Sequence, residues 1–370
     1  MRGRPGLITD YRREMAVFPS NTSAAWFGML VVVLFWLGLN LPADLALLGA
    51  TAAVASVGAI GLNIVTGWAG QISLGHAFFL GLGAYSGAVL GGDSGGRVTG
   101  YGWEMILWLP AAGLVAAAAG LLVAPLAFRL KGLYLAFVTL GLVFIGDHIF
   151  REYKSMTGGQ GVGRSAAPAE IFGWELGKDG NVLGVFLEKE QKFYFFGLLL
   201  LLVMGLLAKN MVRSRIGRAL GAIRDRDIAA EISGVPLARY KVIAFVVSSF
   251  YAGIAGAVLW MFIGFIEPSE FNLLLSIEYI AMVLIGGVAT ISGSIMGATF
   301  ITFLPRIVDW ASGFLPFISD SLTEGVLTAP QVEEMLFGAL IIVFLIVEPL
   351  GLYGLWIRIR NYFKAWPFSY

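Results

Sequence analysis

Apolar segments about as long as a bilayer is thick recur along the whole chain and constrain its fold more than any other feature. About ten are present, each close to the roughly 20 residues that a helix needs to cross the hydrocarbon core. They cover approximately residues 24–41, 44–66, 70–90, 104–128, 132–150, 193–208, 242–263, 274–290, 292–308 and 333–352. This pattern predicts an all-α, polytopic transmembrane helical bundle of about ten spans, forming a single transmembrane domain over residues 1–370.

The composition supports a surface covered by lipid. Hydrophobic residues make up 58% of the 370 residues and charged residues 13%, whereas soluble domains carry about 25% charged residues. The net charge of +1 provides no general field for nucleic acid. The absence of cysteine excludes disulfides and thiol chemistry, and two histidines, His76 and His148, argue against a multi-histidine metal site.

Basic residues indicate which loops lie in the cytoplasm, because Lys and Arg concentrate in cytoplasmic loops near helix ends. Four basic regions stand out, at residues 2–13, 129–131, 209–241 and 358–364. With ten spans, a cytoplasmic N-terminus places all four regions and the C-terminus in the cytoplasm. Loop 151–192 is then extracytoplasmic, as is the acidic stretch 309–334. No obvious cleavage site follows the first apolar segment, which we therefore expect to be a retained span.

Residues 66–76, Thr-Gly-Trp-Ala-Gly-Gln-Ile-Ser-Leu-Gly-His, combine glycines and polar groups at the predicted depth of the membrane. Unwound backbone is tolerated there only where protein or a water-filled path satisfies it, and the ends of broken helices can hold a carboxylate. The stretch predicts either an interrupted helix that lines a path or a short cytoplasmic hairpin between two spans. The first interpretation gives these path residues: Gly67, Gly70, Gln71, Ser73, Gly75, His76, Tyr85 and Glu278.

Loop 209–241 has the pattern of an amphipathic helix. Apolar residues recur at helical spacing at Ile216, Leu220, Ile223 and Ala230. Gly234 and Pro236 then form a suitable stop. A short helix at the cytoplasmic face can dock in a groove of a partner or lie on anionic lipid. Acidic residues between the basic ones argue against the lipid alternative: Asp225, Asp227 and Glu231.

Missing motifs limit the chemistry of the chain. No G-x-x-x-x-G-K-[ST] phosphate loop occurs, so ATP-driven transport would require another polypeptide for hydrolysis. Neither H-E-x-x-H nor G-x-S-x-G is present. Ionisable residues within or near the ends of the predicted spans are few: His76, Asp147, His148, Glu278 and Glu348. These observations argue against a membrane enzyme acting on lipids and against a proton-coupled secondary transporter.

Two stretches, residues 61–76 and 217–234, carry a resemblance to a known family. Supporting matches lie at residues 79–85, 131–134, 138–140, 157–159, 240–245, 276–279 and 286–287. From about residue 50 to residue 349, the chain resembles the LivM-type branched-chain amino acid ABC transporter permease family. It departs from the family after residue 159, where an acidic residue often precedes glycine and this chain has Gln160-Gly161, and near Asp147, where the family often has glutamate and arginine.

The resemblance implies the permease subunit of an ABC importer for branched-chain amino acids in the bacterial inner membrane, without enzymatic activity, metal or cofactor of its own. The implied partners are two ATP-binding subunits, a second related permease and an extracytoplasmic solute-binding protein. Loop 209–241 would be the cytoplasmic coupling loop. Its expected coupling residues are Arg218, Ala219, Ile223, Asp225, Glu231 and Gly234. The two departures leave open an alternative in which the same architecture carries urea or short amides.

Overall fold

The fold is an all-α helical bundle, as predicted. A computed structural model describes residues 21–96, 98–130, 132–182, 184–312, 318–319, 327–348 and 350–365. The basic residues 2–13 and Lys131, which contribute to the predicted orientation, lie outside the described residues. The bundle is formed by α2 (Asn21–Asn40), α3 (Ala43–Asn63) continued by the π-helix η1 (Ile64–Trp68), α4 (His76–Gly91), α5 (Met105–Arg129), α6 (Leu133–Glu152), α8 (Lys189–Arg213), α11 (Leu237–Ile263), α12 (Leu273–Gly286), α13 (Ile291–Ser312) and α14 (Ala329–Val347).

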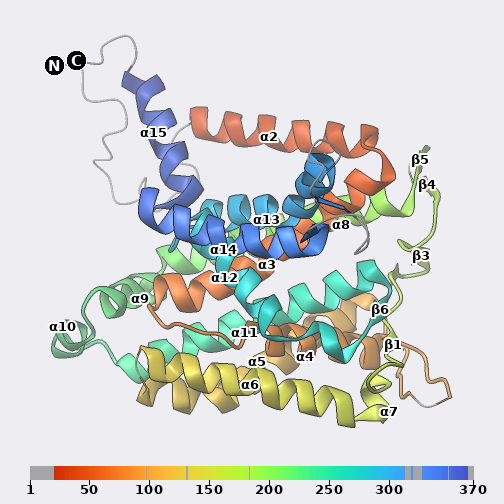
Figure 1. Cartoon of the computed structure of the whole chain (residues 1–370), viewed down its shortest axis with the longest axis horizontal. Helices are drawn as coiled ribbons and strands as arrows, with labels where there is room; N and C mark the ends of the chain where they lie inside the picture. Colours follow the sequence, from red (N-terminus) through yellow and green to blue (C-terminus); the bar gives the residue numbers. More distant parts are fainter. Residues whose placement is uncertain are drawn as a thin grey trace.

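Short elements gather at the two ends of this bundle (Figure 1). The helices α9 (Arg215–Asp225) and α10 (Asp227–Ile232) lie at one end, called here the α9 end. The strands β1 to β6 lie at the opposite end, called the strand end. Three antiparallel pairs form there: β1 (Arg164–Ser165) with β6 (Phe265–Ile266), β2 (Glu170–Ile171) with β3 (Trp174–Glu175), and β4 (Gly180–Val182) with β5 (Val185–Leu187). The remaining elements are α7 (Lys154–Thr157), η2 (Pro268–Glu270), α15 (Gly351–Ala365) and a parallel pair of β7 (Ile318–Ser319) and β8 (Leu327–Thr328).

Every predicted apolar segment coincides with one of the bundle helices. Among the described residues, six helices are long and apolar enough to cross a membrane, and four shorter apolar helices accompany them. The number of spans and the side of each terminus stay predictions. One expectation was wrong in detail: residues 70–75 are not helical, and α4 begins only at His76.

The helices α3 and α11 form the buried centre of the bundle. The helix α11 packs mainly against α5, α4 and α3, whereas α3 packs mainly against α8, α11 and α13. Small residues make this close packing possible, as is usual between membrane helices. A Cβ atom on Gly83 would clash with the backbone of Gly253, and one on Gly256 with the backbone of Leu80. Glycines therefore bring the backbones of α4 and α11 into direct contact.

A fully buried asparagine fastens α3 to the turn between α12 and α13. The Asn63 side chain donates to the carbonyl oxygen of Thr290 at 3.0 Å and to Oγ of Ser294 at 2.7 Å. Its Oδ1 accepts from the backbone N–H of Ala289 at 2.8 Å. Because both polar atoms of the amide are satisfied, this side chain can be buried without a large desolvation penalty.

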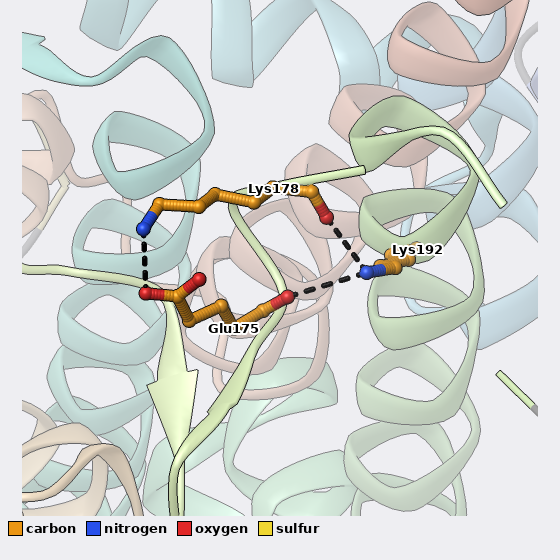
Figure 2. A network of polar contacts seen from close by, with 3 residues as sticks. All are labelled: Glu175, Lys178 and Lys192. Atoms are coloured by element: carbon orange, nitrogen blue, oxygen red, sulfur yellow. Dashed lines mark hydrogen bonds and ion pairs between the residues drawn. The ribbon is translucent and has the colours of Figure 1, made fainter. Parts of the chain in front are cut away.

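Two buried cations fasten the segments of the strand end. The Arg164 guanidinium donates to the carbonyl oxygens of Ala88 and Met156, both at 2.6 Å, and of Thr99 at 3.2 Å. Figure 2 shows Lys192, at the start of α8, pointing toward the loop that follows β3. Its Nζ donates to the carbonyl oxygen of Lys178 at 2.6 Å and of Glu175 at 3.3 Å. The loop between α6 and α8 is therefore tied to the start of α8 and to the end of α4.

Candidate functional site

The helix α3 ends in a turn of π-helix and not in an ordinary cap. The backbone N–H of Ala69 donates to the carbonyl oxygen of Ile64 at 3.2 Å, five residues back. The N–H of Gln71 then reaches the carbonyl oxygen of Val65 at 3.0 Å. Gly70 has a φ of +66°, which lets the chain reverse direction without strain. Short π-helical turns are frequent at functional sites, and this one starts the stretch that the sequence predicts as a path.

Residues 69–75 form a non-helical segment that returns into the bundle. Burial alternates along it: Ile72 is 42% exposed, whereas Gln71 and Ser73 are buried. This alternation is that of a strand with one covered face. The N–H of Leu74 donates to Oγ1 of Thr139 on α6 at 2.9 Å. The polar side chains of the segment therefore point toward the interior of the protein.

The helix α4 begins deep inside the bundle. The His76 imidazole has a hydrogen bond with the backbone of Gly58, and its ring centroid lies 4.9 Å from that of Tyr279 on α12. The N–H of Ala77 donates to Oγ of Ser276 at 3.0 Å. Gly58 lies ten residues before Trp68, about 15 Å along the α3 axis. Residues 66–76 therefore interrupt the helical structure inside the bundle, between α3 and α4, and whether they line a path stays a prediction.

Unpartnered polar atoms follow this interrupted helix. Among the described residues, four buried side-chain atoms along η1, α4 and α12 lack a hydrogen-bond partner: Thr66 Oγ1, His76 Nε2, Tyr85 OH and Tyr279 OH. Buried polar groups are normally satisfied, so a row of such atoms provides groups that a passing polar molecule can hydrogen-bond. Tyr85 lies nine residues beyond His76, about 14 Å closer to the strand end. Glu278, also predicted for the path, is half-buried on α12 and is not part of this row.

The predicted amphipathic helix of the coupling loop is two helices, α9 and α10, separated at Arg226, where the backbone is extended. Ser214 caps α9 by accepting from the N–H of Ile216 at 3.1 Å. The apolar stripe faces inward, because α9 packs against α8, α11 and η1 of the same chain. Ala219 and Ile223 are buried there, so the expectation that this stripe docks on a partner was wrong.

The exposed apolar residues of the loop lie instead on α10, and sequence reasoning missed them. Ile228 is 66% exposed and Ile232 82%. They are four residues apart and so share one face of the helix, while Ala230 is buried. This i, i+4 spacing was visible in the sequence. The predicted coupling residues Glu231 and Gly234 are exposed beside them, and Gly234 has a φ of +85°.

The predicted path and the predicted coupling loop meet at the α9 end. The guanidinium of Arg224 donates to the carbonyl oxygen of Gly67 at 3.4 Å, and its side chain packs against Gly70. A pocket of about 220 Å³ opens between them, with Gly70 and Gln71 on one wall and residues 223–227 on another. Two sets of residues that the sequence places more than 150 positions apart therefore form one site. No group of three or more metal-ligating side chains occurs in the described part of the chain.

An apolar helical bundle with an interrupted helix and a basic loop at one end defines the class as a multi-pass membrane permease. The chain belongs to the family described as "branched-chain amino acid transport system / permease component", whose model matches residues 45–345. Among the described residues, six helices are long and apolar enough to cross a membrane, as membership of this family requires.

Curated relatives carry the same description. The LivM permease proteins of Salmonella typhimurium and Escherichia coli are each 32% identical over 306 residues, which are 79% of this chain and 66% of theirs. The LivH permease protein of Escherichia coli is 25% identical over 306 residues, or 80% of this chain and 90% of LivH. The chain thus spans just under two thirds of the LivM proteins. No solved structure matches it significantly.

Proposed function

We propose that the chain is the membrane-spanning permease subunit of an ABC importer for branched-chain amino acids, with its α9 end in the cytoplasm. The similarity to the LivM and LivH branched-chain amino acid permease proteins supports the solute class. The basic residues of α9 and its flanks support the orientation. The chain itself catalyses no reaction, and hydrolysis belongs to two ATP-binding subunits because the phosphate-loop motif is absent. A second related permease and an extracytoplasmic solute-binding protein complete the assembly.

The translocation path runs along the interrupted helix, from Tyr85 past His76 to Gln71. The row of buried polar atoms without partners is the observation that carries this proposal. A zwitterionic amino acid needs a hydrogen-bonding partner for each charge, and hydroxyl, imidazole and backbone groups supply such partners without a fixed charge. Weak complementarity suits a path that must release its solute, since the solute-binding protein supplies most of the selectivity.

Single cysteines in this cysteine-free chain test the path. We expect Gln71→Cys, Ser73→Cys and His76→Cys to react with small hydrophilic thiol reagents, and the rate to change with the nucleotide state of the assembly. These positions are buried in the structure, so a dependence on nucleotide distinguishes a path from static packing. Ile72→Cys, on the exposed side of the segment, should react equally in every state. Inertness of all three buried positions in transport-active protein would defeat the path.

The helices α9 and α10 contact the ATPase subunits and receive their ATP-driven conformational change. Ile228 and Ile232 enter an apolar groove of the partner, and Arg224 transmits the displacement to residues 67–70. We expect the double variant Ile228→Gln/Ile232→Gln to lose co-purification with the ATPase subunits while its membrane insertion is unchanged. Arg215→Gln, at the exposed start of α9, is the matched control and should co-purify normally. Normal co-purification of the double variant would remove α10 from the interface.

The alternative solute class, urea or short amides, rests on the two departures from the family pattern, at Gln160-Gly161 and near Asp147. A solute panel decides between the two classes in reconstituted vesicles with the cognate binding protein. Saturable, ATP-dependent uptake of leucine, isoleucine or valine supports the proposal. Uptake of urea or acetamide, without uptake of these amino acids, would replace it.

A further inference from the structure

The pocket at the α9 end has walls from three parts of the chain. The interrupted helix contributes Gly70 and Gln71, the junction of α5 and α6 contributes Leu130 and Leu135, and residues 223–227 belong to the coupling loop. Its volume is about 220 Å³. At about 30 Å³ per water molecule, this is room for roughly seven waters, enough for one small amino acid.

The lining of the pocket offers groups of both charges beside an apolar wall. Arg224, Arg226 and Lys241 supply positive charge, and Lys241 is only 6% exposed. Asp225 and Asp227 supply negative charge. Leu130, Leu135 and Ile223 supply apolar surface. A zwitterion with an aliphatic side chain presents the same three features, a carboxylate, an ammonium group and a branched hydrocarbon.

We propose that this pocket is a product site, where the imported amino acid binds before release into the cytoplasm and from which it slows the transport cycle. The inference rests on the proposed function for its solute and orientation. The carboxylate lies toward Arg226 and Lys241, the ammonium group toward Asp227, and the side chain against Leu130 and Leu135. Binding is weak, because the pocket is open to water and charged groups in water interact weakly.

Thermodynamic linkage makes this site regulatory. One wall of the pocket is the coupling loop itself, including Arg224, which also holds the carbonyl oxygen of Gly67. If docking of the ATPase subunits changes the shape of residues 223–227, it changes the affinity of the pocket for the amino acid. By reciprocity, the bound amino acid then changes the docking equilibrium by the same factor. Regulation in this direction requires the pocket to bind the amino acid more tightly when the loop is not docked on the ATPase subunits. A high cytoplasmic concentration of product then lowers the fraction of docked ATPase subunits, and with it the rate of ATP hydrolysis.

Direct binding tests the site on the complete membrane assembly in nanodiscs, without the solute-binding protein. We expect saturable leucine binding, and at least fivefold weaker binding of 3-methylbutylamine, which lacks the carboxylate, and of 4-methylpentanoate, which lacks the ammonium group. Arg226→Gln and Asp227→Asn should each weaken leucine binding at least fivefold, whereas Arg215→Gln should not. Asp227→Asn keeps an oxygen for the N–H of Ile228, to which Asp227 accepts at 2.9 Å, so α10 should be retained. Absence of saturable binding, or equal binding by all three variants, would overturn the site.

Inside-out proteoliposomes test the regulation, with binding protein and leucine enclosed and the cytoplasmic face outward. External leucine should lower ATP hydrolysis by the wild-type assembly at least twofold, and Arg226→Gln should be less sensitive. Hydrolysis that is stimulated by the enclosed binding protein but indifferent to external leucine would overturn the product site and leave the proposed function intact. Failure of enclosed leucine to be transported at all would instead contradict the proposed function.

Discussion

The loops at the two ends of the bundle are held in opposite ways. At the strand end, the buried cations Arg164 and Lys192 donate to backbone carbonyl oxygens of distant segments. At the α9 end, the charges of residues 215–231 are exposed or half-buried, and those with a described partner pair locally: Arg224 pairs with Asp225 at 3.0 Å, and Arg218 donates to a carbonyl oxygen five residues back. The link from this loop into the interrupted helix is the long hydrogen bond from Arg224 to Gly67.

This contrast separates a fixed part of the permease from a movable one. Charge-assisted hydrogen bonds are strengthened where the surroundings are buried, whereas exposed ion pairs contribute about 0–1 kcal/mol. The apolar stripe of α9 stays packed on the bundle, but the segment from residue 225 to residue 234 carries exposed charges and can shift at little cost, which suits a segment that receives force from a partner. Substitutions at the strand end should therefore reduce stability, and substitutions at the α9 end should reduce transport.

The largest effect is expected at Arg164. Arg164→Met removes three hydrogen bonds from a charged donor to backbone carbonyl oxygens, each worth roughly 1.5–3 kcal/mol. It also removes the desolvation penalty of the buried cation, which is several kcal/mol, so the net loss of stability should be about 3 kcal/mol. Chemical denaturation in mixed micelles measures the loss. Arg164→Lys, which keeps the charge and some of the donors, should lose less. A stability of Arg164→Met equal to wild type would show that the strand end is not fixed by this cation.

A smaller loss of the same kind is expected at Lys192. Lys192→Met removes two hydrogen bonds to the loop after β3 and should cost about 1–2 kcal/mol. The control is Lys189→Met, three residues earlier on α8, where an exposed lysine pairs with Glu190 at 3.5 Å. That change should stay within about 0.5 kcal/mol. Equal losses at the two positions would mean that burial of the cation is not what matters.

Much of this fold is readable from the sequence because hydropathy reports the bilayer directly. The ten helices and the interruption near Gly70 follow from apolar length and from glycine placement. Amphipathic spacing, however, states which residues share a face and not what covers that face. For this reason the apolar stripe of α9 was assigned to a partner, although it packs on its own bundle.

The contacts that complete the site are long-range and leave no local pattern. Arg164 is one charge among many in loop 151–192, and only the folded chain shows that it is buried against α4. Asn63 meets the turn at residues 287–290 across more than 220 positions. The contact of Arg224 with Gly67 likewise joins two motifs that were recognised separately.

At the α9 end, transport and not stability should be affected. Gly234 follows α10 with a φ of +85°, where a β-branched residue costs of order 1–3 kcal/mol. Nothing lies within 4 Å of a Cβ atom there, so the cost appears as a changed path of the exposed loop and not as a core clash. We expect Gly234→Val to reduce uptake about tenfold at unchanged membrane insertion.

Gly221 offers the matched control within the same loop. It lies inside α9, has open space around a Cβ atom and has no positive φ. Gly221→Ala should therefore stabilise the helix by up to about 1 kcal/mol and leave uptake intact. Normal uptake by Gly234→Val, or an equal loss in both variants, would contradict the assignment of Gly234 to coupling geometry.

The smallest effect concerns Glu270, a charge at the strand end that is not matched by a cation. Burial raises the pKa of its carboxyl, the indole N–H of Trp260 opposes this by donating to it, and the Glu267 carboxylate adds to the rise. Because the folded-state pKa lies above the unfolded one, the stability associated with this group is present at low pH and is lost as pH rises through the folded pKa. Glu270→Gln keeps an acceptor for Trp260 but cannot ionise.

The Tm of Glu270→Gln should therefore exceed that of the wild type at pH 8, and the two should converge near pH 4. The gain should be smaller than the loss at Lys192, because Glu270 is only half-buried and solvent screens its charge. Glu152→Gln, an exposed glutamate at the end of α6, controls for the change in net charge. If Glu270→Gln changes the Tm equally at both pH values, ionisation is not the cause. The ionised Glu270 would then not lower the stability of the strand end, which Arg164 and Lys192 would hold in place without an electrostatic cost from this carboxylate. The difference in stability between the strand end and the α9 end would be larger as a result.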